Sequence, residues 1–187
     1  AGVKRVKGRI LADDSIFDRE RRAGPDLSPL SGLSFNNGYD GGDYARSPEL
    51  VAAKGLKGAL RKRGVRVNGQ VGRANLPAAT LESEPLAAVA SPTVAKLIEE
   101  TNVPSNNFFA EMLLKRLAAT SGRKGTRKRG NSRVEEFARS VDAGLDAADG
   151  SGLSRYNYLA ASTVIAVLER KYKDDGHRDA FVATLPI

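Results

Sequence analysis

Residues 91–119 read SPTVAKLIEETNVPSNNFFAEMLLKRLAA, a pattern that predicts two consecutive helices. Ser91 and Pro92 supply a capping side chain followed by a proline at the first helical position. Pro104 ends the first helix, and we expect the second to run from about residue 106 to residue 118. Apolar side chains recur at helical spacing in both helices: Val94, Leu97 and Ile98, then Phe109, Met112, Leu113 and Leu117.

The rest of the second half is also helical in its pattern. Further helices are marked by Val134, Phe137, Val141 and Leu145, by Val164, Ile165, Leu168 and Tyr172, and by Phe181. Residues 149–152, between the helices marked by Val134 and by Val164, read DGSG, which is typical of a tight turn.

The first half mixes strand and loop signals. Residues 3–11 suggest an exposed or edge strand, and residues 24–47 are rich in turn-forming residues and suggest a long loop. A helix is expected after Ser47, ending at Gly64, with a short strand at about residues 65–71. We therefore predict an α+β protein, with a β-containing part over residues 1–75 and a mainly helical part over residues 76–187.

Composition removes several classes of function. The chain has 187 residues, no cysteine and a single histidine, so disulfides, thiolate metal sites and histidine-rich zinc sites are excluded. No apolar run approaches the roughly 20 residues of a membrane helix, and residues 1–5 lack the apolar stretch of a signal peptide. We expect neither a metal nor a cofactor.

Positive charge is concentrated in one segment. Residues 121–133 contain six basic residues and no acid, and without them the net charge of +8 would be +2. Three glycines and no apolar side chain predict a loop, and we expect residues 121–130 to have weak order and little contact with the core. It is either a solvated loop or a weak anion-binding loop, whose candidate residues are Arg123, Lys124, Arg127, Lys128 and Arg129.

Several segments resemble one enzyme family. Residues 91–119 are similar to the second-motif region of the D-alanyl-D-alanine carboxypeptidases of the class C penicillin-binding type, the S13 serine peptidases. Residues 149–155, DGSGLSR, with Asn157, resemble a downstream segment of that family, and residues 8–17 and 30–36 resemble pieces of its accessory region. The resemblance implies an accessory-region piece over residues 1–75 and an incomplete, mainly helical piece of a serine transpeptidase-like domain over residues 76–187.

A Ser-x-Asn motif carries the implied chemistry. It occurs at residues 34–36 and 105–107, where about 0.7 occurrences are expected by chance. Only the motif at residues 105–107 begins an amphipathic helix. The motif at residues 34–36 lies in a loop, where we expect it to make turn hydrogen bonds. The resemblance implies that Ser105 joins the proton path of the reaction and that Asn107 holds the substrate amide. Glu111 either shares the face of Asn107 or is an exposed helix charge.

Two other motifs of the family are missing. No Lys-Thr-Gly occurs, and the only Ser-x-x-Lys, residues 121–124, lies in the basic segment and downstream of Ser-x-Asn. The resemblance places the nucleophile motif before residue 1 and the Lys-Thr-Gly strand beyond residue 187. We therefore expect an internal portion of such an enzyme, with no nucleophile of its own, that is inactive alone.

Two functions remain open from the sequence. The first is part of a serine-type carboxypeptidase or endopeptidase that acts on peptidoglycan stem peptides outside the cytoplasmic membrane, in the periplasm, in the cell wall or as a secreted protein. In that case β-lactams would bind only the complete enzyme. The second is a catalytically silent module that binds an anionic polymer through the basic segment, with teichoic acid favoured over nucleic acid.

Overall fold

The computed structural model describes residues 2–22, 28–74, 84–120 and 122–186. It divides into two compact units, residues 1–89 and 90–187, and each unit is described by itself. The predicted α+β class is confirmed, because short strands and helices occur together. The domain boundary predicted between residues 75 and 76 lies outside the described residues.

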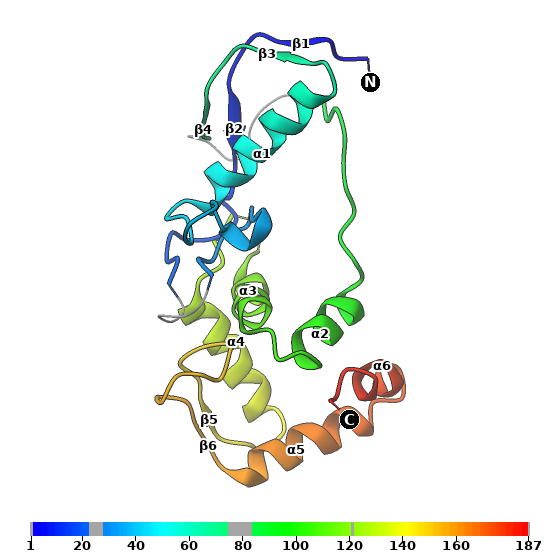
Figure 1. The fold of residues 1–187 in the computed structure, drawn as a ribbon. Helices are drawn as coiled ribbons and strands as arrows, with labels where there is room; N and C mark the ends of the chain where they lie inside the picture. The colour runs from blue at the N-terminus through cyan, green and yellow to red at the C-terminus, as the bar shows by residue number, and fades with distance from the viewer. Residues whose placement is uncertain (1, 23–27, 75–83, 121, 187) are drawn as a thin grey trace. The chain divides into compact units, whose positions relative to one another are not determined.

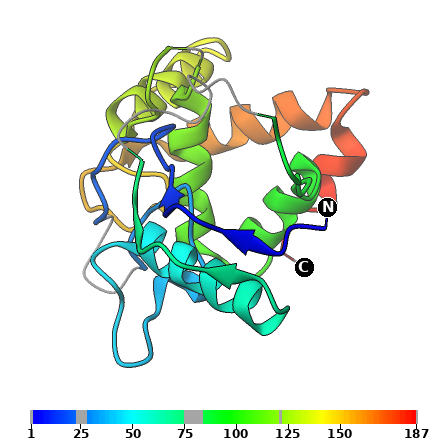
Figure 2. The same ribbon diagram turned by 90° about the horizontal axis from the view of Figure 1, so that it is seen from above.

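The N-terminal unit is built on two short parallel strand pairs. Strand β1 (Arg5–Val6) pairs with β3 (Arg66–Val67), and β2 (Ile10–Ala12) pairs with β4 (Val71–Arg73). Figure 1 shows helix α1 (Pro48–Lys62) alongside these strands, and Figure 2 shows the same strands from above. A 3-10 turn, η1 (Asn36–Gly38), lies in the long segment before α1. The predicted helix is observed, whereas each of the two predicted strands is divided into two short strands.

A buried ion network holds the start of α1. Glu49, in the first helical turn, is completely buried, and its Oε1 accepts a 2.6 Å hydrogen bond from Nε of Arg73. Its Oε2 lies 3.2 Å from Nη2 of Arg21, which also contacts Asp14 at 2.5 Å. Ser47 does not cap the helix through its side chain, because its Oγ accepts instead from the Arg73 guanidinium. The network therefore joins α1 to β4 and to the loop after β2.

The C-terminal unit is mainly helical. Helix α3 (Asn107–Ala118) packs against both α2 (Val94–Asn102) and α4 (Arg127–Arg139). An antiparallel pair, β5 (Leu145–Asp146) and β6 (Tyr158–Leu159), follows α4, and helices α5 (Ala161–Tyr172) and α6 (Arg178–Val182) complete the unit.

Three details of the predicted helices are wrong. The helix expected to extend from Val134 to Leu145 ends earlier, because α4 stops at Arg139 and Leu145 lies in β5. Helix α2 is capped by Thr93, whose Oγ1 accepts from the Lys96 amide at 3.2 Å, and not by Ser91. The buried face of α3 is not the predicted apolar stripe, since Leu117 is 58% exposed. The buried residues are Glu111, Leu114, Lys115 and Ala118. Two of them, Glu111 and Lys115, are ionisable residues, so apolar periodicity predicts the wrong face.

The prediction of a loop over the whole basic segment is also wrong. Helix α4 begins at Arg127, after Thr126, whose Oγ1 accepts from the Arg129 amide at 3.2 Å. The predicted lack of core contact fails at Gly130, which is buried against Leu114 of α3. A Cβ at Gly130 would lie 2.4 Å from the carbonyl oxygen of Leu114 and 2.7 Å from its Cγ. The absence of a side chain therefore permits the close approach of two helices.

This contact predicts an unusual response to Gly130→Ala. Replacing a helical glycine by alanine normally stabilises a helix by about 1 kcal/mol, and Gly58→Ala in α1, with nothing within 4 Å of the added Cβ, should do so. Gly130→Ala should instead lower the free energy of unfolding by about 1–3 kcal/mol, because a backbone carbonyl cannot move aside cheaply. Urea unfolding, monitored by circular dichroism, tests the predictions for Gly58→Ala and Gly130→Ala. A Gly130→Ala variant as stable as the parent would show that the helices do not meet at this glycine.

Candidate active-site helix and the DGSG turn

The second Ser-x-Asn motif lies at the beginning of α3, as predicted. Asn106 is the N-cap, and its Oδ1 accepts from the Phe109 amide at 3.1 Å. Asn107 is the first helical residue and is half-buried. Ser105 is exposed and has a φ of 55°, a left-handed conformation that is unfavourable for a residue with a side chain. The motif thus joins an exposed hydroxyl to a helix start through a fixed turn.

Hydrogen bonds from α2 hold this turn. The Ser105 amide donates to the Asn102 carbonyl at 3.2 Å, and the Asn106 amide donates to the Thr101 carbonyl at 2.7 Å. The Nδ2 of Asn102 donates to Oγ1 of Thr184, which is buried after α6, at 3.3 Å. The end of α2 is therefore tied both to the start of α3 and to the end of the chain.

The other Ser-x-Asn motif belongs to the N-terminal unit. Asn36 begins the η1 turn, has a φ of 51°, and its Nδ2 donates to the Tyr39 carbonyl at 3.3 Å. That local hydrogen bond agrees with the turn role expected from the sequence.

The DGSG turn is organised by one carboxylate. Oδ1 of Asp149 accepts from the Gly152 amide at 2.9 Å and from Nδ2 of Asn157 at 2.8 Å. Its Oδ2 accepts from the Ser154 amide at 2.7 Å and from Oγ of Ser151 at 3.2 Å. Burial raises the pKa of Asp149, but the hydrogen bonds from Asn157, Gly152, Ser154 and Ser151 outweigh burial and hold it below its ordinary value of 3.8.

Asn157 closes the same loop from its other end. Its Oδ1 accepts from the Ala148 amide at 2.7 Å, and its Nδ2 also donates to the Ser154 carbonyl at 3.2 Å. This explains physically why a DGSGLSR segment is followed by an asparagine: the side chain crosses the loop and completes its hydrogen bonding.

Glu111 fastens this loop to α3. The residue is completely buried, and its Oε1 accepts from the amides of Gly150 at 3.0 Å and Ser151 at 3.1 Å. A Cβ at Gly150 would lie 2.8 Å from the carbonyl oxygen of Ala110, so the turn lies directly on the helix. The interpretation of Glu111 as an exposed helix charge is therefore wrong.

Three arginine residues line a second feature, a cavity of about 300 Å³ beside the start of α4. It is lined by Ala118, Thr120, Arg123, Arg129, Ser132, Arg133 and Glu136. Arg123 and Arg129 were among the predicted anion-binding residues, whereas Lys124, Arg127 and Lys128 are not part of the lining. Arg133 was not predicted; its Nη1 lies 3.0 Å from Oε2 of Glu136. Its helical spacing from Arg129 could have revealed it, had the segment been taken as a helix.

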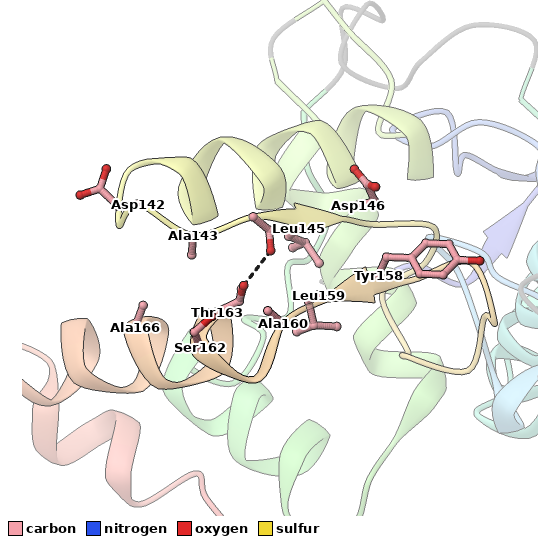
Figure 3. Close-up of a pocket in the computed structure, with 11 residues that line it drawn as sticks. Asp142, Ala143, Leu145, Asp146, Tyr158, Leu159, Ala160, Ser162, Thr163 and Ala166 are labelled. Carbon is pink, nitrogen blue, oxygen red and sulfur yellow. Dashed lines mark hydrogen bonds between the residues drawn. The ribbon is translucent and has the colours of Figure 1, made fainter.

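Another cavity, of about 700 Å³, lies between the β5–β6 pair and the start of α5 (Figure 3). Neither Ser105 nor Asn107 lines it. Its one buried polar side chain, Thr163, donates to the Gly144 carbonyl at 2.7 Å. Two further lining residues, Asp142 and Asp146, are exposed.

The described residues offer neither a metal site nor a membrane span. In the described ranges, no group of three or more His, Cys, Asp or Glu side chains could hold a metal ion. None of the described helices has the length and apolar character needed to cross a bilayer.

The lowered pKa of Asp149 predicts acid sensitivity. Because the folded-state pKa lies below the unfolded value, the stabilisation is present above about pH 4 and is lost as the pH falls through the folded pKa. Asp149→Asn should lower the melting temperature at pH 7, since an amide nitrogen would face a donor, and should flatten its decline below pH 4. Asp175→Asn, at a 92% exposed carboxyl, is the matched control and should leave the profile unchanged. A parent and an Asp149→Asn profile of the same slope would contradict the assignment.

Three relatives place the chain among known proteins. The D-alanyl-D-alanine carboxypeptidase of an Actinomadura species is 36% identical over 124 residues, 65% of this chain and 23% of that protein. The penicillin-sensitive carboxypeptidase A of Dictyostelium discoideum is 28% identical over 104 residues, 53% of this chain and 20% of that protein. Penicillin binding protein 4 (dacB) of Haemophilus influenzae, solved with a β-lactam, matches with a TM-score of 0.61 at 28% identity, over 73% of this chain and 31% of that one.

The chain thus spans less than a quarter of the length of these two curated relatives. The family model of the D-Ala-D-Ala carboxypeptidase 3 (S13) family matches residues 44–187. Because that match takes in most of the sequence, including the α3 helix and the DGSG turn, the chain belongs to the S13 peptidase family.

Proposed function

We propose that this chain is part of a serine-type D-Ala-D-Ala carboxypeptidase that acts on peptidoglycan stem peptides outside the cytoplasmic membrane. The observation that carries the proposal is the Ser105–Asn107 motif at the start of α3, within a chain of the S13 family. The names of the two curated relatives, both carboxypeptidases, support the activity.

The geometry suits the two roles proposed for the motif. An exposed hydroxyl can both accept and donate a proton, as a relay requires, and Ser105 is exposed on a turn held by backbone hydrogen bonds. The amide of Asn107 offers a donor and an acceptor to a substrate peptide bond or to a lysine base. Its backbone is fixed by the helix that follows, which limits reorganisation during reaction.

The nucleophile is the part of the proposal that this chain does not supply. A serine hydroxyl needs a neighbouring base, and in a Ser-x-x-Lys motif the two side chains stand one helical turn apart. Lys124 precedes the first residue of α4, and Gly122 has a φ of 75°, so the described part of residues 121–124 is not helical. We therefore propose that the chain alone neither cleaves D-Ala-D-Ala nor is acylated by a β-lactam.

Acylation by a labelled β-lactam, read by intact mass, tests the proposal. The complete polypeptide encoded by the gene should form a covalent adduct, and the 187-residue chain should not. In the complete polypeptide, Ser105→Ala and Asn107→Ala should each slow acylation by about 100-fold or more, because each removes a group from the reacting centre.

The first Ser-x-Asn motif provides the matched control. Ser34→Ala and Asn36→Ala should leave the acylation rate within about twofold of the parent, the range of ordinary surface substitutions. An adduct on the 187-residue chain would contradict the missing nucleophile. If alanine substitutions in the two Ser-x-Asn motifs slowed acylation equally, the assignment of Ser105 and Asn107 would be contradicted.

A second function is favoured by the cavity beside α4. We propose that Arg123, Arg129 and Arg133 bind a phosphodiester polymer of the cell wall, such as teichoic acid. Three arginines line this cavity, and the lining contains one carboxylate, that of Glu136. Guanidinium groups bind phosphate oxygens in pairs of hydrogen bonds, and the hydroxyl of Thr120 is a further polar group in the lining. The Ser132 hydroxyl already donates to the Lys128 carbonyl at 3.1 Å.

Binding at this cavity should depend steeply on salt. Titration with purified teichoic acid should give an affinity that falls with ionic strength, because binding releases counterions. The double variant Arg123→Ala and Arg129→Ala should reduce the slope of log K against log salt by about two, one for each guanidinium removed. Arg170→Ala, an exposed arginine of α5, is the control and should leave the slope nearly unchanged. Tight binding that is insensitive to salt would contradict this function.

A further inference from the structure

Glu111 is a charged side chain in a position where charge is costly. It is completely buried on α3, and its Oε2 is buried with no hydrogen-bond partner among the described residues. Removing a carboxylate from water is unfavourable unless hydrogen bonds or opposite charges compensate for it. The compensation seen at Oε1 comes from two backbone amides of one turn, those of Gly150 and Ser151. The carboxylate therefore acts as a specific fastening point for that turn.

The fastened turn is itself rigid. Asp149 and Asn157 close it with hydrogen bonds that do not involve α3, so residues 149–157 form a preorganised unit. Gly150 approaches the Ala110 carbonyl and the Leu114 Cβ too closely for any side chain. Together these contacts set a rigid loop against the middle of α3, between Ala110 and Leu114.

The fastening point is one helical turn from the proposed catalytic motif. Glu111 follows Asn107 by four residues on α3, so the two lie on adjacent turns of the helix. Beyond the cap, Ser105 has a left-handed φ that must be imposed by its surroundings. A helix start that carries such a residue needs a support that prevents α3 from shifting or fraying.

We propose that Glu111 is a positioning residue for Ser105 and Asn107: by clamping the 149–157 loop onto α3, it holds the Ser-x-Asn helix start in its reactive geometry. This inference rests on the proposed function. In the proposed reaction, Glu111 contacts no reacting atom and acts only through helix α3.

The chain offers a matched control for such a clamp. Oε1 of Glu135, on α4, accepts from the Ala147 amide at 3.1 Å. This bond is also a carboxylate-to-amide contact between a helix and the segment that leads into the DGSG turn. It comes from α4 and not from the helix that carries Ser105 and Asn107. Losing it should cost stability without moving the motif.

The test compares three variants in the complete polypeptide: Glu111→Ala, Glu111→Gln and Glu135→Ala. The rate of acylation by a labelled β-lactam is measured over a range of concentrations, so that the limiting rate and the half-saturating concentration are obtained separately. Melting temperatures are measured in parallel. All acylation rates are measured at a temperature well below the lowest melting temperature of the variants.

Glu111→Ala should lower the limiting rate by about tenfold or more with little change in half-saturation, because misplacement affects the reacting geometry more than binding. Glu111→Gln should retain most of the rate, since its carbonyl oxygen can accept both amide hydrogen bonds. Glu135→Ala should lower the melting temperature but leave the limiting rate within about twofold. A Glu111→Ala variant with a lower melting temperature and an unchanged limiting rate would overturn the inference.

A second measurement does not depend on activity. In the 187-residue chain, nuclear magnetic resonance should show that Glu111→Ala shifts the amide signals of residues 105–109, whereas Glu135→Ala leaves them in place. If the complete polypeptide is not acylated but these shifts occur, the proposed function fails and the clamp stands. If signals 105–109 do not move in Glu111→Ala, the clamp is wrong whatever the activity.

Discussion

One oxygen of a buried glutamate, Oε1 of Glu111, accepts two backbone hydrogen bonds, and the C-terminal unit is arranged around that contact. The same face of α3 receives the DGSG turn at Gly150 and helix α4 at Gly130, in each case through a glycine that meets Leu114. Helix α2 approaches from the N-terminal end of α3 through the Asn102–Asn106 turn. A shift of α3 would disturb all three contacts together. The Ser-x-Asn motif lies at the end of this well-supported helix.

The N-terminal unit relies on a comparable arrangement. Glu49 is completely buried in the first turn of α1 and meets Arg21 and Arg73 from two other segments. In both units a buried carboxylate joins a helix to distant parts of the chain, by guanidinium groups in one and by backbone amides in the other. Such junctions are directional, so they specify which segments meet, whereas apolar contacts alone tolerate several arrangements.

This use of buried charge explains what could be predicted from the sequence and what could not. Helix ends were predictable where a local signal exists, as at Pro48, Gly64 and Pro104. The buried face of α3 was not, because apolar periodicity assumes that charged residues face water, and Glu111 and Lys115 do not. The start of α4 is not predictable in this way, because Gly130 favours a loop in a local pattern but lies where two helices cross in the structure. The position of Ser-x-Asn at a helix start was predictable from Pro104 and the residues after it, whereas its support by the DGSG turn is a long-range contact that no local pattern reveals.

The account depends most directly on the amides of Gly150 and Ser151 being held by Glu111. Hydrogen exchange of the 187-residue chain, resolved by residue with nuclear magnetic resonance, measures this contact. We expect both amides to exchange about 100-fold or more slowly than in an unstructured peptide, and to lose that protection in Glu111→Ala. Exchange of these two amides at the unstructured rate in the parent chain would contradict the account.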